Sequence, residues 1–220
     1  RHRPAWKFKP PPGTVDDLRS WPSSATFETM PLPAEYSTAD YFLIFEVTKR
    51  LTAGAIADTY GLRFTGPSGI HLAHLRTATN RVFVGGIFTP GAPIPITVYW
   101  GKTGVSQPGS GFPAPSTIMA AFRLFLIFES GAAVDYAPTP ATFTVNGSPT
   151  FVAGLNGQAM QCGSGNSVQT TAAKVRGSAR SDRNAMALTY NPTGDAAART
   201  ICWANWTNDQ RAFQLWGDAN

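Results

Sequence analysis

Charged residues and cysteines are both scarce in this sequence of 220 residues. Only 14% of the residues are charged, against about a quarter in an average globular domain. The two cysteines, Cys162 and Cys202, are too few for a disulfide framework. They form either one bridge or two buried thiols, and we favour the thiols. No Cys-x-x-Cys pair or Cys/His cluster indicates a zinc site.

Long apolar runs are also missing. The longest, 122–128, is interrupted by Arg123 and has the length of a strand, whereas a membrane-spanning helix needs about 20 apolar residues. We therefore expect no membrane insertion. The sequence starts at Arg1 without Met and shows no signal peptide, which indicates a processed chain or a part of a longer one.

Aromatic and turn-forming residues are abundant instead. The chain has 14 phenylalanines, 21 glycines and 18 prolines, and 43% of its residues are hydrophobic. Helices need long periodic runs of Glu, Lys, Leu and Ala, whereas short strands joined by tight turns suit this composition. We predict an all-β protein.

Apolar runs recur every 8–20 residues or so with turn residues between them, as in sandwiches and barrels. In the first half, the predicted strands are 6–8, 26–30, 41–48, 62–64, 81–84, 87–89 and 96–100. In the second half they are 122–128, 141–145, 158–162, 167–170, 185–190, 200–206 and 211–216. Alternation places Leu43, Phe45 and Val47 on one face of their strand. Gly85-Gly86 indicates a bulge or kink, and 66–69 a turn.

The strands fall into two successive modules of β-sandwich or jelly-roll type. A proline-rich N-terminal arm with edge strands occupies 1–40, and the first module follows at 41–104. Gly, Pro and Ser residues at 105–117 are typical of a linker. The second module occupies 118–220.

The first module contains Asp58 and the motifs 61–65 (GLRFT), 81–84 (RVFV) and 95–102 (PITVYWGK). With these motifs it resembles the β module known as domain of unknown function 2341, and Trp6-Lys7-Phe8 is similar to the opening of that family. Trp100 and Lys102 stand where that family usually has Tyr and Asn. These motifs are turn glycines and core-facing residues, so they indicate a fold more than a function.

The second module contains an apolar strand at 122–129, followed by 154–160 (GLNGQAM) and 199–206 (RTICWANW). In these stretches, most loosely in the last, it resembles the start of a concanavalin-A/laminin-G-like lectin domain. Domains of that type extend further than this sequence does, so we expect an incomplete second sandwich. The resemblance also implies calcium as a conceivable cofactor. Candidate loop oxygens belong to Asp195, Asn208, Asp209 and Asp218, but their spacing matches no calcium loop, so we assign no ligands.

No catalytic constellation stands out. Gly-Ser-Gly at 109–111 and 163–165 lacks the frame of a nucleophile elbow. Glycan-cleaving enzymes need two carboxylates that face the same bond, whereas Glu46, Asp58, Glu129 and Asp135 are well separated in the sequence. We assign no catalytic, cofactor-binding or metal-binding residue and predict a chain that is not an enzyme.

The remaining candidates for binding have ordinary structural interpretations. His71 and His74 lie in a strand or loop, where they point to opposite faces, and we interpret them as packed or solvated residues. The basic residues Lys174, Arg176, Arg180 and Arg183 resemble an anion-binding patch, but a solvated loop explains them better because no nucleic-acid motif accompanies them. Trp203 is assigned to the core with Ile201, whereas Trp206 and Trp216 face outward and could stack on sugars.

The leading hypothesis is a non-catalytic, surface-displayed module for structure or recognition. It would belong to a phage virion appendage, such as a fibre or decoration protein, or to a bacterial adhesin. Its partners would be neighbouring protein subunits, in a homo-oligomer or a larger particle, or a cell-surface glycan. The location would be extracellular or on a virion. The alternative is the N-terminal or accessory part of a glycan-cleaving enzyme.

Overall fold

A computed structural model describes most of the first 170 residues. Described are residues 17–29, 40–58, 61–89, 91–105, 112–120, 122, 124–154, 157–161 and 166–170, and the backbone of 199–203 and 214–217. The side chain of Tyr41 is outside this description. The chain divides into two compact units, Arg1–Thr170 and Thr171–Asn220.

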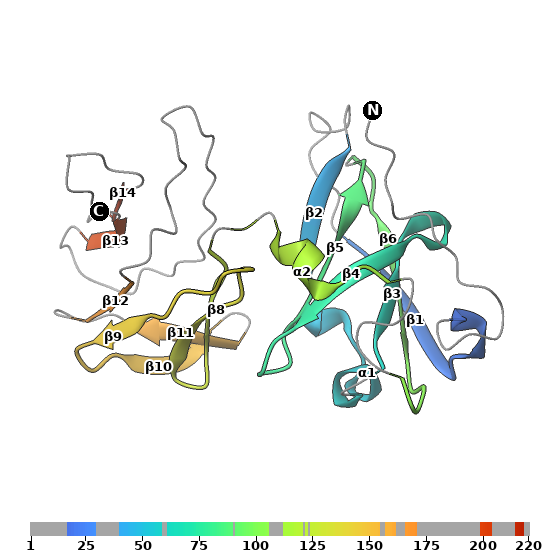
Figure 1. The fold of residues 1–220 in the computed structure, drawn as a ribbon, viewed down its shortest axis with the longest axis horizontal. Coiled ribbons are helices and arrows are strands. Elements are labelled where there is room, and N and C mark those ends of the chain that lie inside the picture. Colours follow the sequence, from blue (N-terminus) through green and yellow to red (C-terminus); the bar gives the residue numbers. More distant parts are fainter. Residues whose placement is uncertain are drawn as a thin grey trace. The chain divides into compact units, whose positions relative to one another are not determined.

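The described chain is an all-β protein, as the sequence predicts. A six-stranded antiparallel sheet in the order β1-β6-β3-β4-β5-β2 curls into half a barrel (Figure 1). Its strands are β1 (Ser23–Glu28), β2 (Tyr41–Glu46), β3 (Arg63–Thr65), β4 (His71–Arg76), β5 (Val82–Phe88) and β6 (Pro95–Trp100). Short helices accompany it: η1 (Leu18–Ser20), η3 (Thr48–Arg50), α1 (Ala53–Ala57) and η4 (Pro67–Gly69).

The concave core of the sheet is formed by alternating apolar residues. In β6, Ile96 and Val98 are fully buried, as their alternation with polar neighbours predicts. Leu43, Phe45 and Val47 belong to this core together, so the predicted face of β2 is confirmed. The turn predicted at 66–69 is confirmed as well, with left-handed backbone at Ser68 (φ 58°) and Gly69 (φ 72°).

The opposite side of the sheet is covered by α2 (Pro115–Met119). Ile118 and Met119 of this helix are buried against Ala73 of β4, and Ile44 of β2 packs beside them. The helix begins within the stretch 105–117 for which a linker is predicted. Its residues Ile118 and Met119 belong to the packed structure.

For Gly85 and Gly86 a bulge or kink is predicted; they form no bulge, so that alternative is wrong, while the kink stays a prediction. Strand β5 runs through both glycines and pairs with β2 without a shift of register. The glycines are required by close packing. A Cβ on Gly86 would lie 2.7 Å from Leu72 Cδ2, and one on Gly85 would lie 3.0 Å from Ile118 Cγ1.

Beyond α2, the described strands form two-stranded antiparallel sheets. They are β7 (Leu126–Glu129) with β8 (Ala132–Asp135), β9 (Thr144–Asn146) with β12 (Ser167–Gln169), and β10 (Thr150–Gly154) with β11 (Gly157–Gln161). The strand predicted at 122–128 is formed only from Leu126 onward. Strands β8 and β10 were not predicted.

In the second unit, β13 (Arg199–Trp203) pairs with β14 (Gln214–Gly217). The register shifts between Thr200 and Cys202, so simple alternation does not extend through Ile201. Both predicted strands are therefore present, while the side-chain assignment of Trp203 and Trp216 stays a prediction. The strands predicted at 6–8 and 185–190 lie outside the described residues. The predicted module boundary at 105–117 lies within the first compact unit and stays a prediction too.

Candidate functional site

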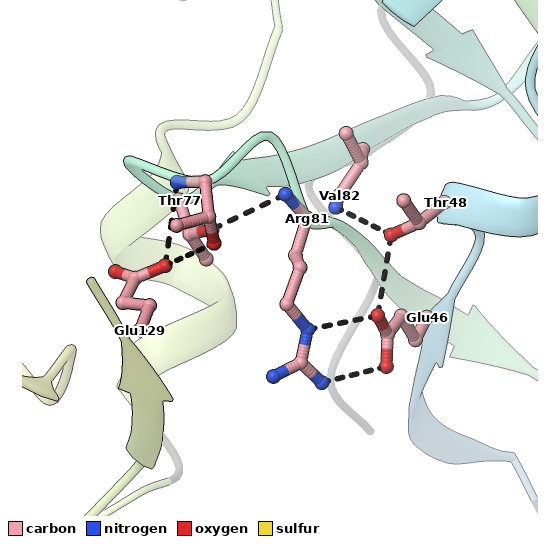
Figure 2. A network of polar contacts seen from close by, with 7 residues as sticks. Glu46, Thr48, Thr77, Arg81, Val82 and Glu129 are labelled. Atoms are coloured by element: carbon pink, nitrogen blue, oxygen red, sulfur yellow. Dashed lines mark hydrogen bonds and ion pairs between the residues drawn. The ribbon is translucent and has the colours of Figure 1, made fainter. Parts of the chain in front are cut away.

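Glu46 is held in a two-pronged ion pair with Arg81. Arg81 Nε donates to Glu46 Oε1 at 2.9 Å, and Arg81 Nη2 donates to Oε2 at 2.8 Å. Thr48 donates its hydroxyl to the same carboxylate at 3.2 Å and accepts the N–H of Val82 at 2.9 Å (Figure 2). This network joins the end of β2 to the start of β5, so Glu46 has a structural role.

Asp58, at the end of α1, binds the backbone just before β3 and just after β6. Its Oδ1 accepts the N–H of Gly61 at 2.8 Å, and its Oδ2 accepts the N–H of Gly101 at 2.6 Å. Arg76 donates to the main-chain oxygens of Asp58 and Ile56. A side chain on Gly61 would meet the carboxylate of Asp58 at 2.8 Å, so the glycine of the quoted motif is explained by this contact.

Asp135 is a buried carboxylate that organises the backbone around the β7–β8 hairpin. It accepts the N–H groups of Phe125 at 3.0 Å, of Ala137 at 2.9 Å and of Ala141 at 2.9 Å. Three backbone donors stabilise a buried negative charge. This carboxylate therefore supports the local fold.

Glu129 connects β7 to the turn between β4 and β5 and is only 2% exposed. Its Oε2 accepts the hydroxyl of Thr79 at 2.5 Å and the N–H of Thr79 at 3.3 Å, and its Oε1 accepts the hydroxyl of Tyr136. Figure 2 shows Glu129 beside Thr77 at this turn. Burial raises the pKa of Glu129. Hydrogen bonds from Thr79, Tyr136 and Thr77 together lower it by more than burial raises it, so the pKa lies below its ordinary value.

Tyr136 completes this link. The N–H of Ala78 donates to the Tyr136 hydroxyl at 3.1 Å, while that hydroxyl donates to Glu129. Burial and the hydrogen bond to Glu129 raise the pKa of Tyr136. The pair keeps its proton on the tyrosine and its charge on the glutamate.

The two histidines lie three positions apart in β4, so the predicted strand with opposite faces is confirmed. Both are 3% exposed. His71 stacks on Phe112 with ring centroids 3.9 Å apart, and His74 lies 5.2 Å from the ring of Phe64. Among the described residues, no group of three or more His, Cys, Asp and Glu could hold a metal ion.

A buried arginine, which sequence reasoning missed, lies in the same part of the sheet. Arg63 is 1% exposed, and its guanidinium carbon lies 5.2 Å from the ring of Trp21 and 5.5 Å from that of Phe112. Its Nη1 donates to the oxygen of Leu62 at 2.9 Å. The arginine thus anchors the segment before β1 and the segment before α2 to β3. In the sequence, Arg63 stands between Leu62 and Phe64, a pattern that is also typical of an exposed strand residue.

The strand pairs beyond α2 present a large half-exposed surface. From 138 to 170, none of the described residues is buried. Phe151 and Met160 face each other across β10 and β11 and are only half-buried. Phe128 lies 6.2 Å from the ring of Phe151, and Val152 is 39% exposed. Apolar side chains of this size normally find a core or a partner. We call the face formed by Phe128, Phe151 and Met160 the second-half surface, whereas Val152 points to the opposite face of β10.

The other predicted candidates lie outside the described side chains. They are the basic residues Lys174, Arg176, Arg180 and Arg183, the loop oxygens of Asp195, Asn208, Asp209 and Asp218, the cysteines Cys162 and Cys202, and Trp206. Their roles stay predictions.

A scan against protein-family models, a search of curated proteins and a search of solved structures each gave no match. The resemblance to domain of unknown function 2341 and to lectin-like domains thus has only the motifs themselves as support. Along the described residues, no helix is long and apolar enough to cross a membrane.

Proposed function

We propose that this chain is a non-catalytic structural module of an extracellular assembly, and that its second-half surface binds neighbouring protein subunits. The assembly would be a phage virion appendage, with the chain as a fibre or decoration protein, or a bacterial adhesin. One observation carries the proposal. The first sheet encloses a core of buried residues, whereas none of the described residues from 138 to 170 is buried.

Physical chemistry explains why such strands call for a partner. A two-stranded ribbon is marginally stable by itself in water, and three or more strands or a packed layer are needed for stability. Each ribbon also has backbone groups along its edges that can pair with an added strand. Subunits that cover the second-half surface would supply both the missing layer and the missing strands.

The carboxylates support a structural role over a glycan-cleaving one. A glycosidase needs two carboxyl groups on either side of one bond. Here Glu46 binds Arg81, Asp58 binds the backbone of Gly61 and Gly101, and Asp135 binds three backbone N–H groups. Glu129 is buried under Thr79 and Tyr136. Each of these groups is engaged by its own surroundings.

The test is amide hydrogen exchange in two preparations. One is the native protein, purified from its source under conditions that preserve assemblies, and the other is the isolated chain. We expect the native protein to sediment as a particle of several chains, and we expect strands β7 to β12 to exchange more slowly there than in the isolated chain. Strands β3 to β6 serve as the internal control, because their core is complete in both. Equal exchange of β7 to β12 in the two preparations would contradict the proposal.

A further inference from the structure

Strand β2 forms one border of the six-stranded sheet and pairs, among the described residues, only with β5 (Figure 1). The direction of its backbone groups follows from one bond. Val47 donates its N–H to the oxygen of Val82 at 2.9 Å, and hydrogen-bonded positions alternate in an antiparallel pair. Leu43 and Phe45 therefore face β5 with their backbone groups. The N–H and C=O groups of Phe42, Ile44 and Glu46 point away from the sheet.

Along its described residues, this border lacks the lysines, prolines and bulges that normally protect an edge strand. Natural edges carry lysines, prolines, bulges or inward-pointing charges. From Tyr41 to Glu46 there is no lysine, proline or bulge, and the single charge, on Glu46, is neutralised by Arg81. The apolar side chains of Phe42, Leu43, Ile44 and Phe45 remain half-exposed.

The other border differs in this respect. In β1, Thr29 donates its N–H to the oxygen of Ile94 at 3.1 Å, so the outward backbone groups belong to Ser24, Thr26 and Glu28. The side chains of these three residues are polar and exposed. Of the two borders, β2 is the one that gains from burial of apolar surface.

We infer that β2 pairs antiparallel with β2 of a second copy of this chain, on a two-fold axis at Ile44. This inference deepens the proposed function, since it specifies one contact of the assembly. In that register Phe42 lies opposite Glu46 of the partner, whose charge is already paired with its own Arg81. A two-fold axis at Leu43 would place Asp40 opposite Glu46 of the partner, and like charges directly opposite are destabilising. A second copy thus supplies a matching apolar strand without opposed charges.

The experiment compares two proline variants by sedimentation velocity over a range of concentrations. Ile44→Pro removes an outward N–H and no bond to β5, and a proline is tolerated at a sheet edge. Thr26→Pro makes the same backbone change on the β1 border, together with loss of the hydroxyl contact to Thr97, and is the control. We expect wild type and Thr26→Pro to form dimers and Ile44→Pro to dissociate about tenfold more readily or more, because two intermolecular hydrogen bonds are lost per dimer.

A second measurement keeps the inference testable if Ile44→Pro does not fold. In the wild-type chain, the amides of Phe42 and Ile44 should exchange faster on dilution, whereas that of Leu43 should not change. A monomer at every concentration, equal dimerisation of Ile44→Pro and wild type, or protection of Ile44 that does not depend on concentration would overturn the inference. Those outcomes leave the proposed function intact, because it rests on the protection of β7 to β12 in the native assembly.

Discussion

The curled sheet and the strand pairs that follow it use similar residues to very different effect. Phe64, Ile96 and Val98 of the sheet are almost completely buried. Phe128 and Phe151 of the strand pairs are equally apolar but only half-buried. Burial of apolar surface is the main favourable contribution to folding. The comparison therefore places the stability of the isolated chain in the sheet and the capacity for further association in the strand pairs.

The largest test of this comparison is a matched pair of phenylalanine truncations. Phe64→Ala should lower the free energy of unfolding by about 3–5 kcal/mol, the usual cost of deleting a fully buried ring. Phe151→Ala should cost under about 1 kcal/mol in the isolated chain, because its side chain already contacts water. Urea denaturation of both variants gives the two values. Equal losses would show that the strand pairs have a core of their own.

A packing change at the middle of β5 should have the next largest effect. In Gly86→Ala, the new Cβ would lie 2.7 Å from Leu72 Cδ2 in the core, and overpacking costs about 1–3 kcal/mol. We expect a loss near 3 kcal/mol, because Leu72 is 1% exposed and has little room to move. Thermal unfolding measures it. A neutral result would mean that the core of the sheet is looser than its burial indicates.

The buried link between the strand pairs and the sheet comes third. Glu129→Gln should cost about 2 kcal/mol at neutral pH, because hydrogen bonds to a charged acceptor are stronger than those to a neutral one. The pKa of Glu129 in the folded chain lies below its ordinary value of 4.5, so its contribution is present above that value and is lost as the pH falls through the folded pKa.

Stability measured against pH separates this contribution from a simple packing defect. The wild type should lose stability between neutral pH and the acid limb more steeply than Glu129→Gln does. At the alkaline end, the raised pKa of Tyr136 predicts stability that is present below 10 and is lost as the pH rises through the folded pKa. Tyr136→Phe should flatten that limb. Parallel curves for variant and wild type would exclude the link as a titrating contact.

The smallest expected effect concerns the ion pair at the end of β2. A double-mutant cycle with Glu46→Gln and Arg81→Gln should give a coupling of about 1 kcal/mol, the upper end for pairs that are not deeply buried. The side chains are 17% and 16% exposed. In the pair of Asp17 and Arg19, the arginine is 60% exposed and the aspartate 13%, so this pair should give a smaller coupling than Glu46 and Arg81. Equal coupling in the two cycles would show that the burial of Glu46 and Arg81 adds nothing.

Local patterns predicted the sheet better than they predicted its contacts. Alternation located β2 and β6 and assigned Leu43, Phe45 and Val47 to one face, because burial of one face imposes a period of two. The role of Gly85 and Gly86 could not be predicted, since it depends on Leu72 and Ile118 from other elements. A pair of glycines in a strand has the same local signature for a bulge and for a close contact.

The contacts of the buried polar side chains could not be predicted from the sequence either. Arg63 alternates with Leu62 and Phe64 and has the pattern of an exposed residue, yet it is buried between Trp21 and Phe112. Those two rings come from segments far away along the chain. The carboxylates were correctly recognised as well separated in sequence, but their partners, mostly backbone N–H groups, carry no sequence signature at all.

The pairing of β1 with β6 has a consequence for folding during synthesis. Thr26 and Thr97 are hydrogen-bonded neighbours although 71 residues separate them. During synthesis β1 leaves the ribosome first, and its partner follows only after four other strands of the sheet have emerged. Distant pairing of this kind slows folding, because the intervening loop must be closed first. Until β6 is synthesised, β1 stays unpaired and exposed to water. The polar, exposed side chains of Ser24, Thr26 and Glu28 disfavour its association with other nascent chains on the same messenger RNA.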